Sequence, residues 1–397
     1  MSVDIVIVNW NGRDDTLACL DAVRPQLAEV DEASVTVVDN GSTDGSIAAI
    51  TARHPHVRFL PLGSNRGFTG GLAAAVARTR ARNVIFLNND AVPEPGWLAS
   101  LVRAIDGAAD DVASIGGKIV SIDGASIDFI GGAMTFDGHA FQLGFRMPLG
   151  SRPEPAAGAE LFFACGGNMI TRRAALERLG GFDDDYFAYL EDVDFGWRTW
   201  LSGGRALYEP RAVVRHHSSA TSNRLGNFER GVLFERNALQ TALKNFDDDS
   251  LHEASGALFY AYLHRLHHFA TTRNANAGEL ARAAFAGTID NGKPSLLKRI
   301  GRKLFGPKPL AAIDDPLTTM QFRAFDWIVR NGERIAKKRA AVQALRVRSD
   351  RELFEKFPLY FVPTYPGDDA MMGGALFRAL RPRVASVEQT LSDIMRP

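Results

Sequence analysis

The chain has 397 residues, of which 46% are hydrophobic and 23% are charged, which places it among ordinary globular proteins of roughly two to three domain-sized units. Lys plus Arg and Asp plus Glu both total 46, and this balance excludes the global charge field that draws proteins to nucleic acid. The 2 cysteines, Cys19 and Cys165, are too few for a disulfide framework or a thiolate metal cluster, which fits a reducing compartment.

The amino terminus opens on a strand-length apolar run at residues 3–8, without the basic flank or small-residue cleavage site of a signal peptide. No later stretch reaches the ~20 continuous apolar residues that a membrane span requires. We therefore expect a cytoplasmic protein, with the cytoplasmic face of the plasma membrane as the place of any peripheral contact.

Short β-rich runs alternate with helix-like segments in the first part of the chain, at residues 5–8, 35–38, 57–60 and 84–87. This alternation predicts an α/β fold with a parallel sheet, whose ligands bind beyond the carboxyl ends of the strands. The Gly-, Pro- and aromatic-rich stretch 119–155 predicts strands and loops over one edge of the site. Helices at 172–179 and 193–201 and short strands at 206–208 and 212–214 follow, and the pattern is helical from about residue 223.

Two loops carry candidate ligand-binding residues. Asp39 ends the second run, where its carboxylate can accept a hydrogen bond from a nucleobase N–H; Ser42 and Asp44 can cap the next helix at the same time. Asn65 and Arg66 lie in a Gly-rich loop before a helix, where Arg66 can pair with a phosphate. A plain loop that packs the helix against the sheet is the alternative for this second segment.

Oxygen-bearing side chains follow the fourth run, as Asn88, Asn89 and Asp90. Mg and Mn prefer oxygen ligands, so Asp90 is a candidate metal ligand and Asn88 offers a neutral oxygen nearby; a simple turn is the alternative. A later apolar run ends in His216 and His217, and imidazole suits Mn. His216 is a ligand only if it faces Asp90.

An acidic helix start carries Glu191 and Asp192, where the helix dipole favours ionised carboxylates and so holds one as a base. Asp194 and Arg198 lie four residues apart and can pair on one helix face. For Asp194 and Trp200 we prefer a structural role, in the helix cap and in the core.

Together, in this order and spacing, these segments resemble the family 2 glycosyltransferases of the GT-A fold, particularly their bacterial rhamnosyltransferase-like branch. The resemblance covers residues 3 to about 222 and rests on Ile-Val-Asn-Trp-Asn at 7–11, Val-Asp-Asn-Gly-Ser-Thr-Asp-Gly-Ser at 38–46, Asn-Arg-Gly at 65–67, Gly-Gly-Phe-Asp at 180–183 and Glu-Asp-Val-Asp at 191–194. It implies a GT-A domain, a Rossmann-like mixed sheet flanked by helices, over residues 1–222. A mainly helical region over 223–397 would then serve acceptor, membrane-surface or oligomer contacts.

The resemblance also implies roles for matching positions. Asp39 would bind the base of the nucleotide, and Asp192, beside Glu191, matches the catalytic base. Asp90 matches the acid of the family's Asp-x-Asp motif for Mn or Mg, with Asn88 where an acid is often found, and His216 would complete the metal site. The remaining expected donor-binding positions are Asn9, Asn11, Asn65, Arg66, Asn88 and Asn89, and the expected acceptor-binding positions are Gly167, Asn168, Trp197 and Arg198.

The implied reaction is a single inverting displacement, in which Asp192 takes the proton of the acceptor hydroxyl and the cation stabilises the departing diphosphate. The branch points to thymidine diphosphate rhamnose as the donor and to a glycan or lipid-linked acceptor in cell-surface polysaccharide synthesis. UDP-galactofuranose and UDP-N-acetylglucosamine are the alternative donors. A non-catalytic sugar-nucleotide-binding scaffold and a nucleotidyltransferase are the alternative functions; near the chain start only Arg13 would suit a triphosphate.

Two basic tracts mark the C-terminal region. Residues 296–305 are short, basic and amphipathic, which suits an anionic membrane surface or, equally, a helix packed on the catalytic domain. Residues 334–351 form a second tract, predicted as a membrane-facing patch and not as a nucleic-acid site. All of the chemistry is expected within roughly the first 220 residues.

Overall fold

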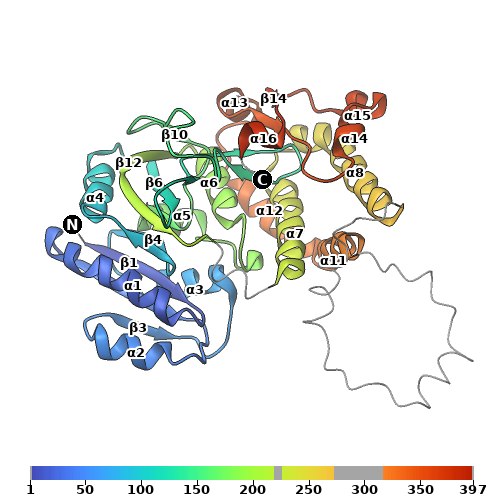
Figure 1. Ribbon diagram of the computed structural model, residues 1–397. Coiled ribbons are helices and arrows are strands. Elements are labelled where there is room, and N and C mark those ends of the chain that lie inside the picture. The colour runs from blue at the N-terminus through green and yellow to red at the C-terminus, as the bar shows by residue number, and fades with distance from the viewer. Residues whose placement is uncertain (1, 219–225, 272–315, 396–397) are drawn as a thin grey trace, which may run out of the picture.

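The computed structural model describes residues 2–218, 226–271 and 316–395, so the basic segment 296–305 lies outside the described residues. One large sheet forms the amino-terminal half, and helices of the carboxy-terminal half pack beside it (Figure 1). The predicted α/β class with a helical C-terminal region is therefore confirmed.

The sheet is mixed. Its strand order is β10-β12-β6-β11-β4-β1-β2-β3, with β5 on β12 and β7 on β6. The predicted parallel part consists of β1 (Val3–Asn9), β2 (Ala33–Asp39), β3 (Arg58–Pro61) and β4 (Asn83–Asn88). Strand β11 (Asn168–Arg172) is antiparallel to both β4 and β6 (Val112–Ser121). Asn9 pairs with Asp39 and Val8 with Asn88, so the polar strand ends lie at one edge.

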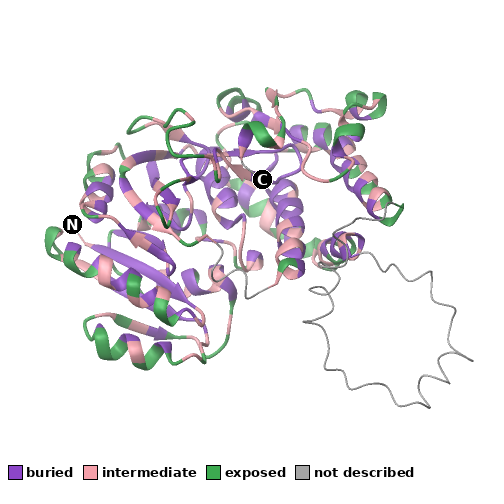
Figure 2. Ribbon diagram, viewed as in Figure 1, coloured by how far each residue is buried: buried purple, intermediate pink, exposed green. Residues whose placement is uncertain are grey.

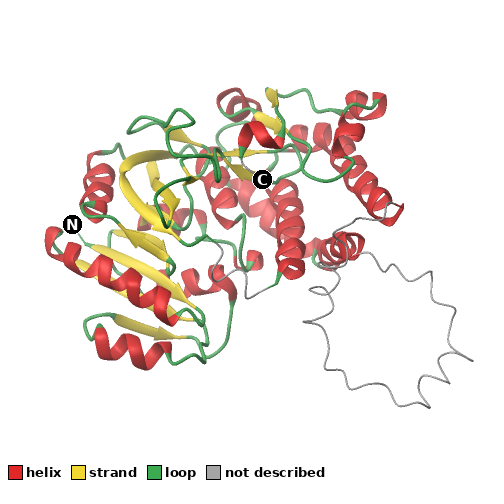
Figure 3. Ribbon diagram, viewed as in Figure 1, coloured by secondary structure: helices red, strands yellow, loops and turns green. Residues whose placement is uncertain are grey.

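Both faces of the sheet are covered, which explains why its strands are continuous apolar runs. Ile5 and Ile7 enter one core and Val6 and Val8 the other, as the two-residue period of a strand requires. Buried strands run between the helical layers in Figures 2 and 3. The covering helices are α1 (Arg13–Val23), η1 (Arg24–Glu29), α2 (Ser46–Arg53), α3 (Gly67–Val76), α4 (Trp97–Gly107), α5 (Arg173–Leu179) and α6 (Glu191–Leu201).

Differences from the predicted elements have local causes. Helix α3 begins at Gly67, within the predicted Gly-rich loop, because Gly67 has φ +75° and lets the chain turn into the helix there. The two short strands predicted at 206–208 and 212–214 form one strand, β12 (Arg205–His216), with an irregularity between Glu209 and Val213. The stretch 119–155 forms short strands as predicted; the short strands of the domain are β5 (Ala91–Pro93), β7 (Ile127–Phe129), β8 (Gly132–Met134), β9 (Ala140–Gln142) and β10 (Glu160–Leu161).

The C-terminal part is mainly helical, with one small sheet of β13 (Leu359–Phe361) and β14 (Ser386–Glu388). No described helix is both long and apolar enough to cross a membrane. The helices are α7 (Asn227–Asn245), α8 (Asp248–Thr271), α11 (Pro316–Arg330), α12 (Gly332–Ala344), α13 (Asp350–Lys356), α14 (Asp368–Met372), α15 (Ala375–Leu380) and α16 (Leu391–Ile394).

The second basic tract, residues 334–351, differs from its prediction. Five of its cations bond to groups of the protein itself: Arg334, Lys338, Arg339, Arg346 and Arg348. Arg339, for example, donates to the backbone oxygens of Leu243 and Phe246 at the end of α7. The tract therefore ties α12 to α7 and to the catalytic half, and its role as a membrane-facing patch is not supported.

A buried ionic network joins the two halves. Arg265 of α8 donates to Asp137 at 2.8 Å and to Asp368 at 2.9 Å. His139, in the turn between β8 and β9, lies 3.1 Å from Asp137 and 3.1 Å from Glu235 of α7. All five side chains are buried, so the C-terminal helices are anchored to the sheet domain by charges that water does not reach.

Candidate active site

A cavity of about 560 Å³ lies beyond the carboxyl ends of β1 and β4. Its lining includes the strand-end residues Val8 and 88–90, and the loops 165–167 and 187–193. Ligands of open α/β sheets bind at this edge. The predicted residues that line it are Asn65, Asn88, Asn89, Asp90, Gly167, Glu191, Asp192 and His216.

The predicted metal ligands face each other. His216 Nε2 lies 3.0 Å from Asp90 Oδ1 and 3.2 Å from the amide nitrogen of Asn88, so the condition set for His216 is met. Asp90 is buried, which raises the pKa of its carboxyl, but its hydrogen bond and ion pair with His216 outweigh this and lower that pKa. Burial lowers the pKa of His216, and hydrogen bonds to Asp128 and Asp90 overcome it and raise that pKa to about 10.

Asp128 of β7 is a residue that the sequence did not reveal. Its Oδ2 lies 2.9 Å from His216 Nδ1 and also accepts a hydrogen bond from the Ser218 hydroxyl. A carboxylate on one ring nitrogen of a histidine fixes the ring orientation and directs the other nitrogen toward a metal. No motif precedes Asp128 in the sequence, so only the pairing of β7 with β6 brings it to the site.

These groups fit a divalent cation. Neighbouring ligands of an octahedral ion with bonds of about 2.1 Å lie about 3.0 Å apart, and Asp90 Oδ1 and His216 Nε2 have this separation. The oxygen and nitrogen of the Asn88 amide can exchange places by a flip of the side chain, which would add a third ligand atom. A carboxylate and an imidazole together suit Mn better than Mg.

Two acids at the start of α6, Glu191 and Asp192, also line the cavity. Asp192 is half-buried, and its carboxylate accepts N–H groups of Gly166 at 3.1 Å and Val193 at 2.9 Å. Burial raises its pKa, and these backbone hydrogen bonds offset the rise only in part. Burial, and then the charge of Asp192, raises the pKa of Glu191. Within the described part of the chain Glu191 Oε2 has no hydrogen-bond partner. The pair thus holds protons more readily than free carboxyls do.

The loop before these acids has a strained backbone. Phe187 has φ 63° and ψ −58°, and the N–H of Ala188 donates to the carbonyl of Tyr186 at 2.7 Å, which defines a γ-turn of the rare positive-φ form. Tyr189 and Leu190 also have positive φ, 72° and 63°. Each such residue costs on the order of 1–3 kcal/mol, and strain of this kind clusters at functional sites.

The residues predicted to bind the nucleobase form hydrogen bonds between two neighbouring loops. Asp39 is buried and accepts hydrogen bonds from the N–H groups of Gly41 at 3.2 Å and Ser42 at 3.0 Å and from the Asn9 amide at 3.2 Å. Asn11 Oδ1 accepts the N–H of Thr43 at 2.7 Å. Asp39, Asn9 and Asn11 therefore hold the loops at 9–12 and 39–44 together, and they lie outside the cavity lining. Arg66 is exposed and also lies outside it.

Three residues predicted on the acceptor side are interior residues and do not line the cavity: Asn168, Trp197 and Arg198. Asn168 Oδ1 accepts the indole N–H of Trp97 at 2.8 Å, and Trp197 donates its own to Asp350 at 3.0 Å. Arg198 pairs with Asp194 at 2.7 Å, as predicted for that helix face. These side chains are buried and bonded to other residues of the protein, so we exclude them from the acceptor site.

Aromatic side chains and the C-terminal part supply walls that the sequence did not predict. Phe141 and Phe145 come from the β9 region, while Arg230 and Phe234 come from α7 and Met395 follows α16. The cavity lining therefore includes residues after 222, whereas the residues assigned to the chemistry all lie within the first 220 or so. Helical periodicity alone does not indicate which face of α7 meets a cavity.

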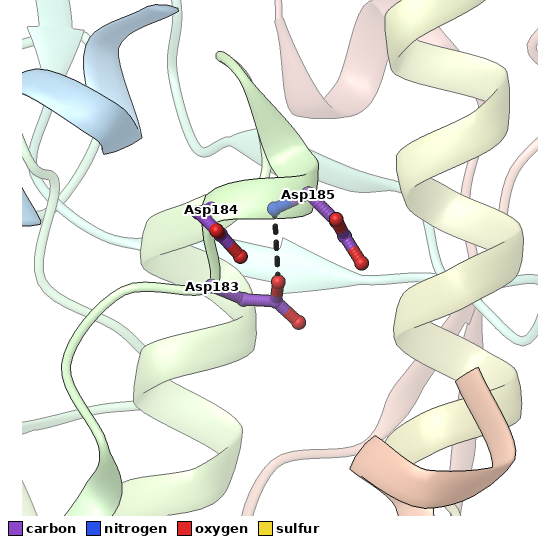
Figure 4. A group of neighbouring side chains, drawn as sticks. All are labelled: Asp183, Asp184 and Asp185. Carbon is purple, nitrogen blue, oxygen red and sulfur yellow. Dashed lines mark hydrogen bonds between the residues drawn. The ribbon is translucent and has the colours of Figure 1, made fainter. Parts of the chain in front are cut away.

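A second acidic cluster, Asp183, Asp184 and Asp185, could hold an ion by geometry alone (Figure 4). In Figure 4 the N–H of Asp185 donates to Asp183 across the turn. Lys244 lies 2.6 Å from Asp183, and Lys338 contacts both Asp183 and Asp185. Two ammonium groups and the Arg334 guanidinium, 2.9 Å from Asp185, thus pair with the three carboxylates, so the cluster ties α7 and α12 to the loop and is not our metal candidate.

Comparison with known proteins identifies the family of the chain. A profile described as glycosyl transferase family 2 matches residues 4–180. The N-acetylglucosaminyl-diphospho-decaprenol L-rhamnosyltransferase of Mycobacterium tuberculosis is 33% identical over 220 residues, which cover 48% of this chain and 68% of that protein. The O-antigen biosynthesis protein RfbC of Myxococcus xanthus is 28% identical over 229 residues, covering 54% of this chain and 17% of that protein.

Among solved structures, the mannosyltransferase PcManGT from Pyrobaculum calidifontis, in complex with GDP-Man and Mn2+, is 22% identical with a TM-score of 0.44, covering 83% of this chain and 86% of that chain. The sequence matches define a glycosyltransferase that uses a nucleotide-sugar donor. More particularly, the chain belongs to glycosyl transferase family 2.

Proposed function

We propose that this chain is a metal-dependent inverting hexosyltransferase that moves L-rhamnose from a nucleoside diphosphate to a hydroxyl of a glycan or lipid-linked acceptor in cell-surface polysaccharide synthesis. The observation that carries the proposal is the shared cavity. Asp90, Asp192 and His216 all line it, and the Asp90–His216 pair lies at the ends of the strands. A donor held by its diphosphate at the strand ends would have its sugar in the same cavity as Asp192.

Asp192 is the general base of this reaction. Its carboxylate, held by the N–H groups of Gly166 and Val193, accepts the proton of the acceptor hydroxyl as that oxygen attacks the anomeric carbon. The bond to the diphosphate breaks on the opposite face of the sugar, so the configuration inverts. A covalent sugar–enzyme intermediate, as in the two-step retaining glycosidases, is not required.

Asp90 and His216 would hold the cation, with Asn88 as a neutral third ligand. Once bound, the cation supplies stabilisation of the negative charge that grows on the leaving diphosphate. Asp128 orients His216 for this task. Because Asn88 replaces an acid, fewer negative charges face the metal than in an Asp-x-Asp site.

The donor and acceptor are inferred from the relative of known activity. The rhamnosyltransferase of Mycobacterium tuberculosis carries rhamnose and a diphosphate-linked decaprenol in its name. The aromatic residues of the cavity lining, among them Phe141, Phe145 and Phe234, suit a sugar ring and an apolar acceptor portion. UDP-galactofuranose and UDP-N-acetylglucosamine are the alternative donors, and a binding scaffold without turnover is the non-enzymatic alternative.

A panel of nucleotide sugars tests the proposal. The full chain is incubated with TDP-rhamnose, UDP-galactofuranose or UDP-N-acetylglucosamine and with a diphosphate-linked polyprenyl glycan, and release of nucleoside diphosphate is measured. We expect TDP-rhamnose to be consumed at least 10-fold faster than the others, with an inverted product. Faster use of a UDP sugar would contradict the rhamnose assignment, and tight donor binding without turnover of any sugar would favour the scaffold.

Removal of the metal is expected to abolish turnover, and added Mn²⁺ should restore it. Manganese binding itself is measured by the loss of the free Mn²⁺ resonance signal on titration. His216→Ala should weaken this binding by more than about 100-fold, which exceeds the loss typical of residues outside the ligand shell. His217→Ala is the matched control, because His217 is the exposed neighbour. Equal Mn²⁺ affinity in both variants would refute the assigned ligand.

A further inference from the structure

Helix α7 donates hydrogen bonds to the strained loop that precedes Glu191 and Asp192. The side-chain amide of Asn237 donates toward the backbone oxygens of Tyr186 at 3.0 Å, Ala188 at 2.8 Å and Tyr189 at 2.7 Å. Asn237 is fully buried. An amide NH₂ has two hydrogens, so its entire donor capacity serves this single loop.

Arg236, the preceding residue of α7, also donates hydrogen bonds to this loop. Its guanidinium donates to the backbone oxygens of Asp185 at 2.6 Å and Tyr186 at 3.0 Å. It also donates to Asn237 Oδ1 at 3.1 Å, and Gln240 donates to the same oxygen at 3.0 Å, which fixes the orientation of the Asn237 amide. Four carbonyls of the loop thus receive donors from α7, whereas the carbonyl of Phe187 accepts the N–H of Thr69 of α3 at 3.2 Å.

The loop that is bonded to α7 also lines the cavity. Phe187, Ala188, Tyr189 and Leu190 all line it, and Leu190 is the N-cap residue of α6, on which Asp192 lies. A backbone with a positive-φ γ-turn at Phe187 persists only where its surroundings determine it. Here those surroundings include the polar groups of Arg236 and Asn237, which lie outside the segment that matches the family profile.

We propose that Asn237, assisted by Arg236, is a positioning residue that holds residues 185–190 in their strained conformation and so aims Asp192 at the acceptor side of the cavity. The role of Asp192 as base rests on the proposed function; the mechanical role of Asn237 does not. Released from Asn237, the loop relaxes toward negative φ and the start of α6 shifts. Misplacement of a catalytic group by about 1 Å can cost 100-fold in rate.

Asn237→Asp removes the donors and keeps an oxygen for Arg236 and Gln240. Arg236→Gln is the second variant, in case the first does not fold. Arg339→Gln is the matched control, because Arg339 donates to the backbone oxygens of Leu243 and Phe246 at the far end of the same helix. Amide hydrogen exchange is followed across residues 185–193 in each folded protein, together with kcat, KM and nucleoside-diphosphate affinity.

We expect exchange at 185–193 to accelerate at least 10-fold in the Asn237 or Arg236 variant and to stay unchanged in Arg339→Gln. In the same variant kcat should fall about 100-fold, with nucleoside-diphosphate affinity unchanged. Unchanged local exchange, or a loss of kcat equal to that of Arg339→Gln, would overturn the positioning role. If the wild type turns over no donor, the proposed function fails, whereas the exchange result still decides whether Asn237 holds the loop.

Discussion

Asp192→Asn is expected to lower kcat by about 10²–10⁴-fold, the usual contribution of a general base, while the protein stays folded and binds nucleoside diphosphate normally. The carboxamide keeps the shape of the side chain and one oxygen for the Gly166 N–H, so the loop at 165–167 should remain in place. The acceptor hydroxyl then has no carboxylate to receive its proton. Steady-state kinetics with saturating donor measure the effect.

The pH dependence of activity is a second test of Asp192, and its direction can be predicted. Burial raises the pKa of Asp192, and only the deprotonated carboxylate accepts a proton. Wild-type activity should therefore fall as the pH is lowered through that raised pKa, and the residual activity of Asp192→Asn should lack this fall. Asp184→Asn, an exposed acid eight residues earlier, is the control and should retain activity within about twofold. An Asp192→Asn variant with wild-type kcat would exclude Asp192 as the base.

Arg265→Met is expected to lower the free energy of unfolding by about 3–5 kcal/mol, because it removes the guanidinium that two buried carboxylates share and leaves Asp137 with His139 alone. Asp137 and Asp368 are both buried and both bond to the Arg265 guanidinium. Because Met preserves most of the side-chain volume, the lost free energy of unfolding would come from the removed charge and not from a cavity. Urea unfolding of the full chain, followed by fluorescence, measures the change.

Arg323→Met provides the comparison on the surface. Arg323 pairs with Glu229 at 2.8 Å, but both side chains are 44% exposed, so this substitution should cost only about 0–1 kcal/mol. If the two variants unfolded at the same urea concentration, the buried network would not be what anchors α8 to the β8–β9 turn.

The sheet and the polar strand ends were predictable because their signal is local. A strand buried on both faces must be apolar throughout, and the residues that follow Asn9, Asp39 and Asn88 turn because the strands end there. The pairing of His216 with Asp90 was conditional on the fold, since 126 positions separate them. The register of β12 with β5 pairs His216 with Ala91 and so brings His216 next to Asp90.

The remainder of the site depends on contacts and torsions that no local pattern encodes. Asp128 reaches His216 from another strand, and Asn237 reaches the loop at 186–189 from a helix about fifty positions away. Trp197 and Arg198 stand beside the acids in sequence, yet they turn inward because α6 buries the face that carries them. Positive φ at Phe187 and Leu190 is equally invisible in the sequence, since both are residue types that rarely adopt it.

The cavity takes its walls from early and late parts of the chain, and this has a consequence for biosynthesis. The strands that carry Asn88 and Asp90 emerge from the ribosome first and can pair as soon as β1, β2 and β4 are available. Phe234 and Met395 complete the enclosure only much later. A nascent chain can thus form the strand-end side of the cavity long before the C-terminal residues that complete its lining have been synthesised.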